Sequence, residues 1–238
     1  MIKKILLMIL MGIICVASVN GATVVIPSAQ IANCYANDGE TSNVTLYLDQ
    51  AKDGLSGYKM TIGFSISGIA KINSVSFPEW ANTTYNVVGT LPGQKVTVSA
   101  ADLYQKVQSG SKKVPLCTLD ISGITFGTTS LTVEVTEMTN DYGKSIPITP
   151  YPYSSIIVYS IPPLQSSLDA PRDMNHDGLL DDFNGNRVID MNDIVVFFQA
   201  WSYGVTNSLP VAPFDYNQNG RVDVNDIVTY FNLIWKAS

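Results

Sequence analysis

Tyr58-Lys59-Met60-Thr61-Ile62-Gly63-Phe64-Ser65-Ile66 decides the fold, because apolar side chains occupy every second position of these nine residues. A period of two is typical of a β-strand with one buried face. Gly-containing turns such as Asp53-Gly54 and Pro92-Gly93 separate further runs of this kind. The spacing predicts a mainly β region over residues 22–160, folded as an antiparallel sandwich. Its other expected strands are 44–48, 72–77, 85–88, 95–99, 116–121, 131–137 and 156–159.

The first 21 residues resemble an export signal. Lys3 and Lys4 precede an apolar run over residues 5–19, which is shorter than the roughly 20 residues that span a membrane. We predict cleavage after Gly21, with Ala17 as the alternative, and a secreted or cell-surface protein with no membrane span in its mature form.

Two cysteines remain once this signal is removed. Cys34 and Cys117 make an even number for an oxidising compartment. A disulfide between them and a pair of buried thiols are the two alternatives.

Composition excludes several classes of protein. Hydrophobic residues make up 46% and the formal net charge is −6, which excludes a disordered acidic tail and a strongly basic nucleic-acid binder. Residues 22–160 contain no His, so triads of the Ser-His-Asp or Cys-His type and the common His-containing zinc sites cannot form there. We therefore expect no enzyme and no nucleic-acid partner.

The C-terminal part carries a motif that is specific for calcium. Residues 215–226 place oxygen-bearing side chains at positions 1, 3, 5, 9 and 12 of a 12-residue loop, with Gly220 at position 6. Calcium takes six to eight oxygen ligands, which alternate positions of a tight loop can supply. An amphipathic helix with Ile227 and Tyr230 on its apolar face should follow. The expected ligands are Asp215, Asn217, Asn219, Asp223, Asp226 and the carbonyl of Arg221.

The same unit occurs 33 residues upstream, and nine of 20 aligned residues are identical between 182–201 and 215–234. Arg187 takes the place of Gly at position 6, so this loop needs either a residue with positive φ or an adjusted backbone. The expected ligands are Asp182, Asn184, Asn186, Asp190, Asp193 and the carbonyl of Val188.

A further loop begins just before this unit, with Asp173, Asn175, Asp177, the Leu179 carbonyl and Asp181 at positions 1, 3, 5, 7 and 9. Two frames compete. In the first, residues 182–193 hold one ion and the upstream residues hold an extra one. In the second, the upstream carboxylates share one site with Asp190 and Asp193 across an insertion. We favour the first because it matches the second repeat residue for residue, and we expect His176 to face solvent.

Four segments of the β region resemble cohesin modules: residues 55–62, 114–121, 126–133 and 140–146. Related carbohydrate-binding sandwiches share much of this pattern. The resemblance implies a jelly-roll sandwich of the cohesin or carbohydrate-binding-module type.

The two loop–helix units resemble a dockerin module, and the doubled first loop with Asn184-Gly185-Asn186 is similar to dockerins of archaeal secreted proteins. Dockerins bind cohesins. The resemblance implies that Met191, Asn192, Val224 and Asn225 contact a partner, although the Ser/Thr pair of bacterial cellulosome dockerins is absent. With the signal and a short Pro/Ser stretch, the expected layout is signal 1–21, sandwich 22–160, Pro/Ser linker 161–168 and a small α-helical dockerin domain 169–238.

Together these features predict a secreted, non-catalytic scaffold or adaptor that binds two calcium ions, with a third in the upstream loop. Its expected partners are cohesin- or dockerin-bearing secreted proteins, including further copies of itself. The alternative is a carbohydrate-binding module that a dockerin tethers to a polysaccharide-degrading complex. Leaving out Asp169 and the boundary residue Asp181, the other eight of the ten Asp residues in 169–238 fall at positions 1, 5, 9 or 12 of these loops.

Overall fold

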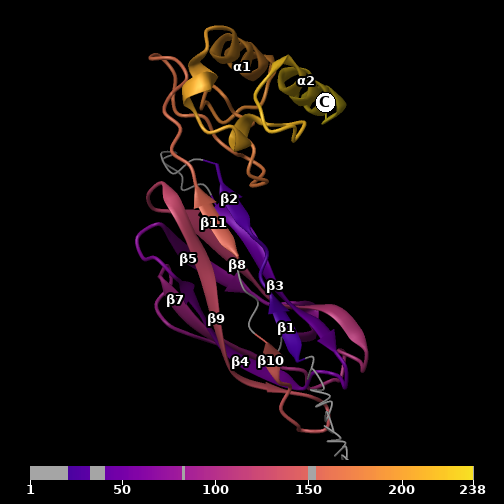
Figure 1. The fold of residues 1–238 in the computed structure, drawn as a ribbon. Coiled ribbons are helices and arrows are strands. Elements are labelled where there is room, and N and C mark those ends of the chain that lie inside the picture. The colour runs from indigo at the N-terminus through magenta and orange to yellow at the C-terminus, as the bar shows by residue number, and fades with distance from the viewer. Residues whose placement is uncertain (1–20, 33–40, 82–83, 150–153, 238) are drawn as a thin grey trace, which may run out of the picture.

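The computed structural model describes residues 21–32, 41–81, 84–149 and 154–237. A long sandwich of strands leads into a helical region at one of its ends (Figure 1). The helical region comprises two α-helices and two short 3-10 helices. They are α1 (Met191–Ser202), η2 (Val205–Ser208), η3 (Ala212–Phe214) and α2 (Val224–Ala237).

The chain is mainly β, and its strands form two sheets. One sheet has the order β10-β1-β3-β8-β5 and the other β2-β11-β9-β4-β7-β6. One 3-10 helix, η1 (Glu79–Ala81), interrupts the strands. The strands are β1 (Ala22–Val25), β2 (Ala29–Ile31), β3 (Thr41–Ala51), β4 (Gly57–Phe64), β5 (Ala70–Ser76), β6 (Tyr85–Val88), β7 (Lys95–Ala101), β8 (Ser111–Gly123), β9 (Gly127–Thr139), β10 (Ile148–Thr149) and β11 (Ser155–Val158).

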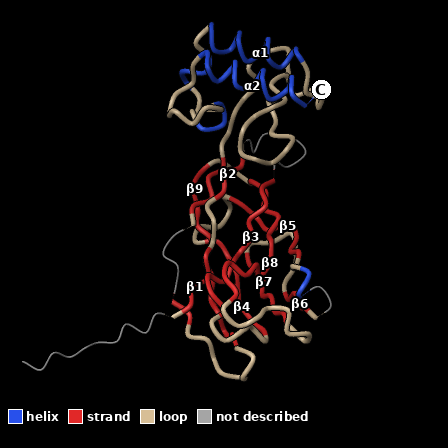
Figure 2. Tube along the Cα trace, turned by 90° about the vertical axis from the view of Figure 1, so that its right-hand side faces the viewer, coloured by secondary structure: helices blue, strands red, loops and turns tan. Residues whose placement is uncertain are grey.

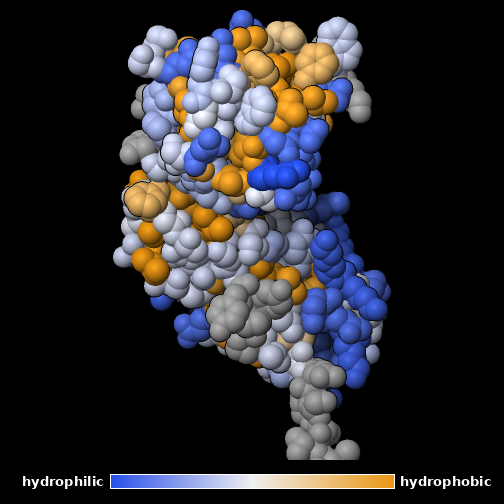
Figure 3. Space-filling view, turned by 45° about the horizontal axis from the view of Figure 1, so that its top comes forward, coloured by the Kyte–Doolittle hydropathy of each residue, from blue (hydrophilic) through white to orange (hydrophobic). Residues whose placement is uncertain are grey.

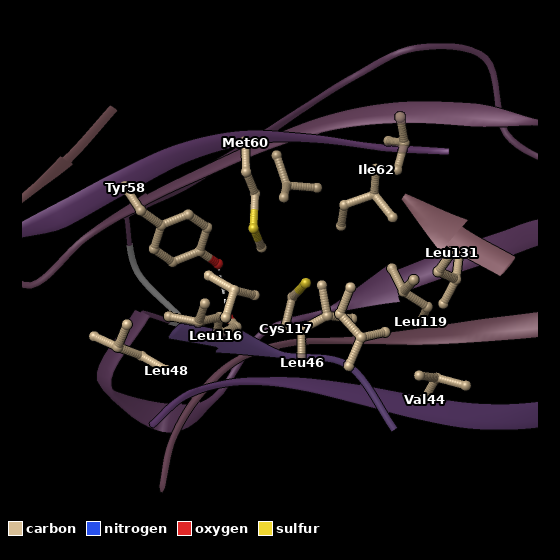
Figure 4. Close-up of a cluster of buried hydrophobic side chains, with 14 of the residues drawn as sticks. Val44, Leu46, Leu48, Tyr58, Met60, Ile62, Leu116, Cys117, Leu119 and Leu131 are labelled. Carbon is tan, nitrogen blue, oxygen red and sulfur yellow. Dashed lines mark hydrogen bonds between the residues drawn. The ribbon is translucent and has the colours of Figure 1, made fainter. Parts of the chain in front are cut away.

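The alternation around Tyr58 produces the buried face that the sequence predicts. Tyr58, Met60 and Ile62 point inward from β4 toward Leu116 and Leu119 of β8 in the opposite sheet (Figure 4). The Tyr58 hydroxyl donates a hydrogen bond of 2.7 Å to the Leu116 carbonyl. Burial of this kind contributes about 1.5–3 kcal/mol for each large apolar side chain. The expected strand is too long at its C-terminal end, because β4 stops at Phe64 and the Ile66 side chain is 54% exposed.

The sandwich is not wholly antiparallel, which corrects the sequence-based expectation. β1 pairs with β10 and β2 pairs with β11 in parallel, whereas the other strand pairs are antiparallel. Pro27 lies between β1 and β2 and has no N–H to donate to a ladder. The N-terminal segment therefore breaks there and gives one strand to each sheet. The last strands, β10 and β11, run in the same direction as β1 and β2 and pair with one of them in each sheet.

Cys117 lies in the core of the sandwich with no exposed surface. Burial raises the pKa of its thiol to about 12. Cys34 and residues 1–20 of the predicted signal 1–21 lie outside the described residues, so the disulfide and the signal stay predictions.

The helical region has a separate core built from aromatic rings. Phe183 and Phe197 stack with their ring centroids 4.4 Å apart, and Phe214 and Tyr230 close around them. Phe183 and Phe197 are wholly buried, and Tyr230 is 2% exposed. These rings hold α1 and α2 together, so the loop that precedes each helix is fixed relative to the other. Among the described residues, no helix is long and apolar enough to cross a membrane.

Candidate calcium loops and the helix starts beside them

The two predicted 12-residue loops fold alike from their first ligand position. The Asp182 carboxylate accepts hydrogen bonds from the backbone N–H groups of Asn186 at 3.0 Å and Arg187 at 2.7 Å. Asp215 accepts the equivalent bonds from Asn219 at 3.0 Å and Gly220 at 2.8 Å. Each Asp therefore curls the following five residues around its side chain, which turns alternate oxygen-bearing residues toward the inside of the loop.

The last ligand position of each loop is also part of the following helix. Asp193 accepts hydrogen bonds from the Asn184 N–H at 3.1 Å and the Asp190 N–H at 2.9 Å, and forms a capping box with Asp190 at the start of α1. Asp226 accepts the same bonds from Asn217 at 3.1 Å and Asp223 at 2.7 Å. These hydrogen bonds thus connect the first and last positions of residues 182–193, the first of the two frames, within one loop. They also give a reason for Asp at position 12, because its short side chain reaches back to the loop backbone.

The backbone of these loops repeats as well. Positions 4 and 6 are left-handed in both, with φ of 73° and 68° at Gly185 and Arg187, and 57° and 83° at Gln218 and Gly220. Of the two options that the sequence leaves for Arg187, the chain adopts positive φ. This conformation costs a non-glycine residue about 1–2 kcal/mol. The loop geometry therefore overrides the preference of the residue.

The upstream loop is a third copy of the same turn. Asp173 accepts hydrogen bonds from the N–H groups of Asp177 at 3.2 Å and Gly178 at 2.7 Å, and His176 and Gly178 are left-handed. An antiparallel bridge between Arg172 and Asp182 closes the loop at its base. The bridge thus joins the base of this loop to the first residue of 182–193, and His176 is exposed as expected.

The middle ligands of all three loops bond to the backbone in one pattern. The position 3 side-chain oxygen accepts from the N–H at position 5, and the position 5 oxygen accepts from the N–H at position 7. The acceptors are Asn175, Asp177, Asn184, Asn186, Asn217 and Asn219, and the N–H groups at position 7 belong to Leu179, Val188 and Arg221.

The carboxylates are buried with few cations near them. Asp182, Asp193 and Asp226 have no exposed surface. Arg172 Nε lies 3.9 Å from Asp182, whereas Asp193 and Asp226 have no Lys or Arg partner in the described part of the chain.

Burial also shifts the protonation of these groups. It raises the pKa of Asp181 to about 6 and moves the pKa values of Asp173 and Asp193 above the usual range of an Asp. Arg221 Nε forms an ion pair of 2.9 Å with the Asp223 carboxylate at the surface. The pKa of Asp223 is lowered, chiefly by the hydrogen bond that its carboxylate accepts from the Asn225 N–H.

The donor set fits calcium in chemistry, because each loop offers carboxylate, amide and carbonyl oxygens and buried negative charge. Among the described residues, however, no group of three or more His, Cys, Asp or Glu side chains is placed to hold a metal ion. The carboxylates face backbone N–H groups instead.

The residues predicted to contact a partner occupy equivalent places at the two helix starts. Met191 and Val224 are 52% and 45% exposed, and Asn192 and Asn225 are exposed beside them. Apolar residues gather on the helical end of the molecule in the space-filling view (Figure 3).

Sequence reasoning missed the next turn of each helix. Val195 and Val228 are 49% and 52% exposed, and Phe198 is 48% exposed. Val195 and Val228 follow Met191 and Val224 by four residues, and Phe198 follows Val195 by three. This spacing puts them on the same helix face and could have identified them. We call this set the helix-start surface: Met191, Asn192, Val195, Phe198, Val224, Asn225 and Val228.

No protein-family model matches the chain, and no curated protein matches it. The chain is similar to a non-cellulosomal cohesin from the archaeon Archaeoglobus fulgidus, with 13% identity over 59% of this chain and 92% of that one and a TM-score of 0.46. A cohesin in a complex with a dockerin from Clostridium thermocellum is 9% identical over 58% of this chain and 99% of that one, with a TM-score of 0.48. The CaCohA2 structure from Clostridium acetobutylicum is 17% identical over 58% and 90%, with a TM-score of 0.47. These three solved structures are cohesin modules, alone or with a dockerin.

Proposed function

We propose that the chain is a secreted, non-catalytic adaptor that assembles with other secreted proteins through calcium-dependent contacts of the cohesin–dockerin type. The observation that carries this proposal is the duplicated helix-start surface. Met191, Asn192 and Val195 recur as Val224, Asn225 and Val228, exposed at the same places beside loops of the same geometry. Exposed apolar side chains next to polar ones are typical of surfaces that bind other proteins.

In this proposal calcium acts on folding. The same carboxylates, Asp193 and Asp226, cap the helices and belong to the loops, so an ion bound in a loop would hold the helix start in place. Binding free energy then becomes folding free energy. At micromolar affinity and millimolar calcium, each ion would add about 4 kcal/mol to the stability of the helical region. Two ions are expected in residues 182–193 and 215–226, and a third in residues 173–181.

The near-identity of the two helix starts has a consequence for the complex. A partner that binds at Met191 and Asn192 should also bind at Val224 and Asn225 in a second orientation. The resemblance to dockerins implies such dual binding. Only one of the two helix starts is then needed at a time.

The experiment immobilises the full chain and probes it with a panel of cohesin modules, including residues 22–160 of this chain, in calcium and in chelator. We expect capture in calcium only. Met191→Asp or Val224→Asp alone should weaken capture by no more than a few fold, whereas the double variant should abolish it. Val211→Asp is the matched control, because Val211 is exposed in the same region but lies outside both helices.

Capture that survives in chelator, or a double variant that binds like the wild type, would contradict the proposal. Failure to capture any cohesin module would also contradict it.

A second candidate function is saccharide binding, and one observation favours it. A cleft of about 720 Å³ lies between the sandwich end and the loops, lined by hydroxyl and amide side chains that include Ser42, Asn43 and Gln218. Affinity electrophoresis on soluble polysaccharides tests this function. Retardation that Asn43→Ala removes and Asn86→Ala, an exposed control on β6, leaves intact would support it, and unretarded migration would exclude it for the polysaccharides used.

A further inference from the structure

The third loop, residues 173–181, is fastened to the second repeat although it precedes the first. The Leu180 N–H donates a hydrogen bond of 2.9 Å to the Pro213 carbonyl in η3. The hydroxyl of Tyr216 donates to the carbonyl of Leu180, and the hydroxyl of Tyr230 donates to the carbonyl of Asp181. These bonds hold the third loop against the loop and helix of the second repeat, so the three move together.

The other side of the third loop lies against the sandwich. Gly178 is buried, and a Cβ atom built there would be only 3.3 Å from the Cβ of Gln30 on β2. Gly178 also has a φ of 93°, which side chains rarely adopt. Glycine therefore permits the close approach of the loop to the strand. Gln30, His176, Asp177 and Gln218 line the cleft beside this contact.

The chain also crosses between the two regions in two adjacent segments. Ala32, directly after β2, is wholly buried in the core of the helical region, and so is Ile161, three residues after the end of β11. The Tyr159 N–H donates a hydrogen bond of 3.0 Å to the Ile31 carbonyl, which ties the two segments together. Leu164 is 5% exposed in the same core. Part of the expected linker 161–168 is thus packed against the helical region.

We propose that the third loop is a strut that seats the helical region on the end of the sandwich, so that both regions move as one body. One contact is the paired chain segments at Ala32 and Ile161, and the other is Gly178 against Gln30. Two separate contacts prevent the rotation that a single linker would allow. In Figures 1 and 2, α1 and α2 lie at the end of the molecule distant from the strands.

A consequence follows that rests on the proposed function. A helix-start surface held at the far end cannot fold back onto the sandwich of its own chain. Contacts between the sandwich and this surface would therefore join separate copies head to tail and would not close one copy on itself.

Distances between paired spin labels test the strut without any partner. Labels are placed at Lys59→Cys on β4 and Asn232→Cys on α2, both exposed, in a chain that lacks the predicted signal and carries Cys34→Ser. Cys117 is buried and should not react. Pulsed electron resonance should give one narrow distance distribution for this chain.

Two substitutions at Gln30 should broaden that distribution or shift its mean. Gln30 is exposed, but its Cβ lies beside the Gly178 backbone, so Gln30→Trp crowds the loop and the isosteric Gln30→Glu places a negative charge beside the acidic loop. Gln50→Trp and Gln50→Glu are the matched controls, because Gln50 is exposed near the C-terminal end of β3. Both should leave the distance distribution narrow. Circular dichroism verifies that each variant is folded.

A broad distribution in the unsubstituted chain overturns the proposal, since the two regions would then move independently. A narrow and unshifted distribution in folded Gln30→Trp and Gln30→Glu also overturns it. These readouts do not depend on a partner, so a failure of the proposed adaptor function would leave them unchanged.

Discussion

The sandwich and the helical region solve the problem of burial in different ways. Met60, Ile62 and Leu116 have no exposed surface, and Asp102 is the single buried carboxylate among the described residues of the sandwich. In the helical region six Asp side chains are buried: Asp173, Asp181, Asp182, Asp193, Asp215 and Asp226. Buried charge is costly unless it is paired or bound to a metal. The core of the sandwich is thus almost wholly apolar, whereas the helical region buries carboxylates, and under the proposed function calcium balances their charge.

The largest expected effect comes from removing the loop carboxylates. Asp193→Ala together with Asp226→Ala deletes the last ligand and a helix cap in each repeat. At about 4 kcal/mol per ion, the loss approaches 8 kcal/mol and should unfold the helical region. Circular dichroism should show lost helix and retained strand. Asp49→Ala plus Asp53→Ala, both exposed in the sandwich, is the control, and unchanged helix in the loop variant would break the comparison.

A core substitution should do the reverse. Met60→Ala leaves a cavity between the sheets and should cost the sandwich about 2–5 kcal/mol, in calcium and in chelator alike. Urea unfolding followed by tryptophan fluorescence measures this, since Trp80 is 8% exposed in the sandwich core. Lys59→Ala, the exposed neighbour, should change stability by less than about 0.5 kcal/mol. A cost for Met60→Ala that depends on calcium would mean that the regions do not fold separately.

The same Gly→Ala substitution can be made in each region at positions with matching backbone conformation. Gly220 and Gly110 have φ of 83° and 82°, and a Cβ atom would meet nothing within 4 Å at either. Alanine at each should therefore cost about 1–2 kcal/mol for its backbone conformation alone. Gly220→Ala should lower only the calcium-dependent transition and Gly110→Ala only that of the sandwich, measured by thermal unfolding. Equal effects of one variant on both transitions would count against separate folding.

The smallest effect concerns pH. Burial raises the pKa of the Cys117 thiol to about 12, whereas an unfolded thiol ionises near 8.5. The contribution of the neutral thiol to the free energy of unfolding is thus complete below about pH 8.5 and declines as the pH rises toward 12. In a Cys34→Ser chain, Cys117→Val should make the stability of the sandwich less sensitive to pH over that range. A slope of stability against pH that Cys117→Val leaves unchanged would contradict this assignment.

Local patterns predicted the features that depend on neighbours in the chain. The alternation at Tyr58, Met60 and Ile62 predicted β4, and the loop spacing from Asp182 and Asp215 predicted where each helix begins. The parallel pairs escaped prediction because β1, β2 and β10 have four residues or fewer and show no period of their own. The contact of Gly178 with Gln30 joins residues far apart in sequence, so no local pattern could reveal it.

Calorimetry of the full chain in calcium and in chelator tests the central claim most directly. We expect two unfolding transitions. The transition of the helical region should shift to lower temperature or disappear in chelator, while that of the sandwich should stay in place. Chelator that leaves both transitions unmoved, or moves both equally, would contradict the claim that only the helical region needs the cation.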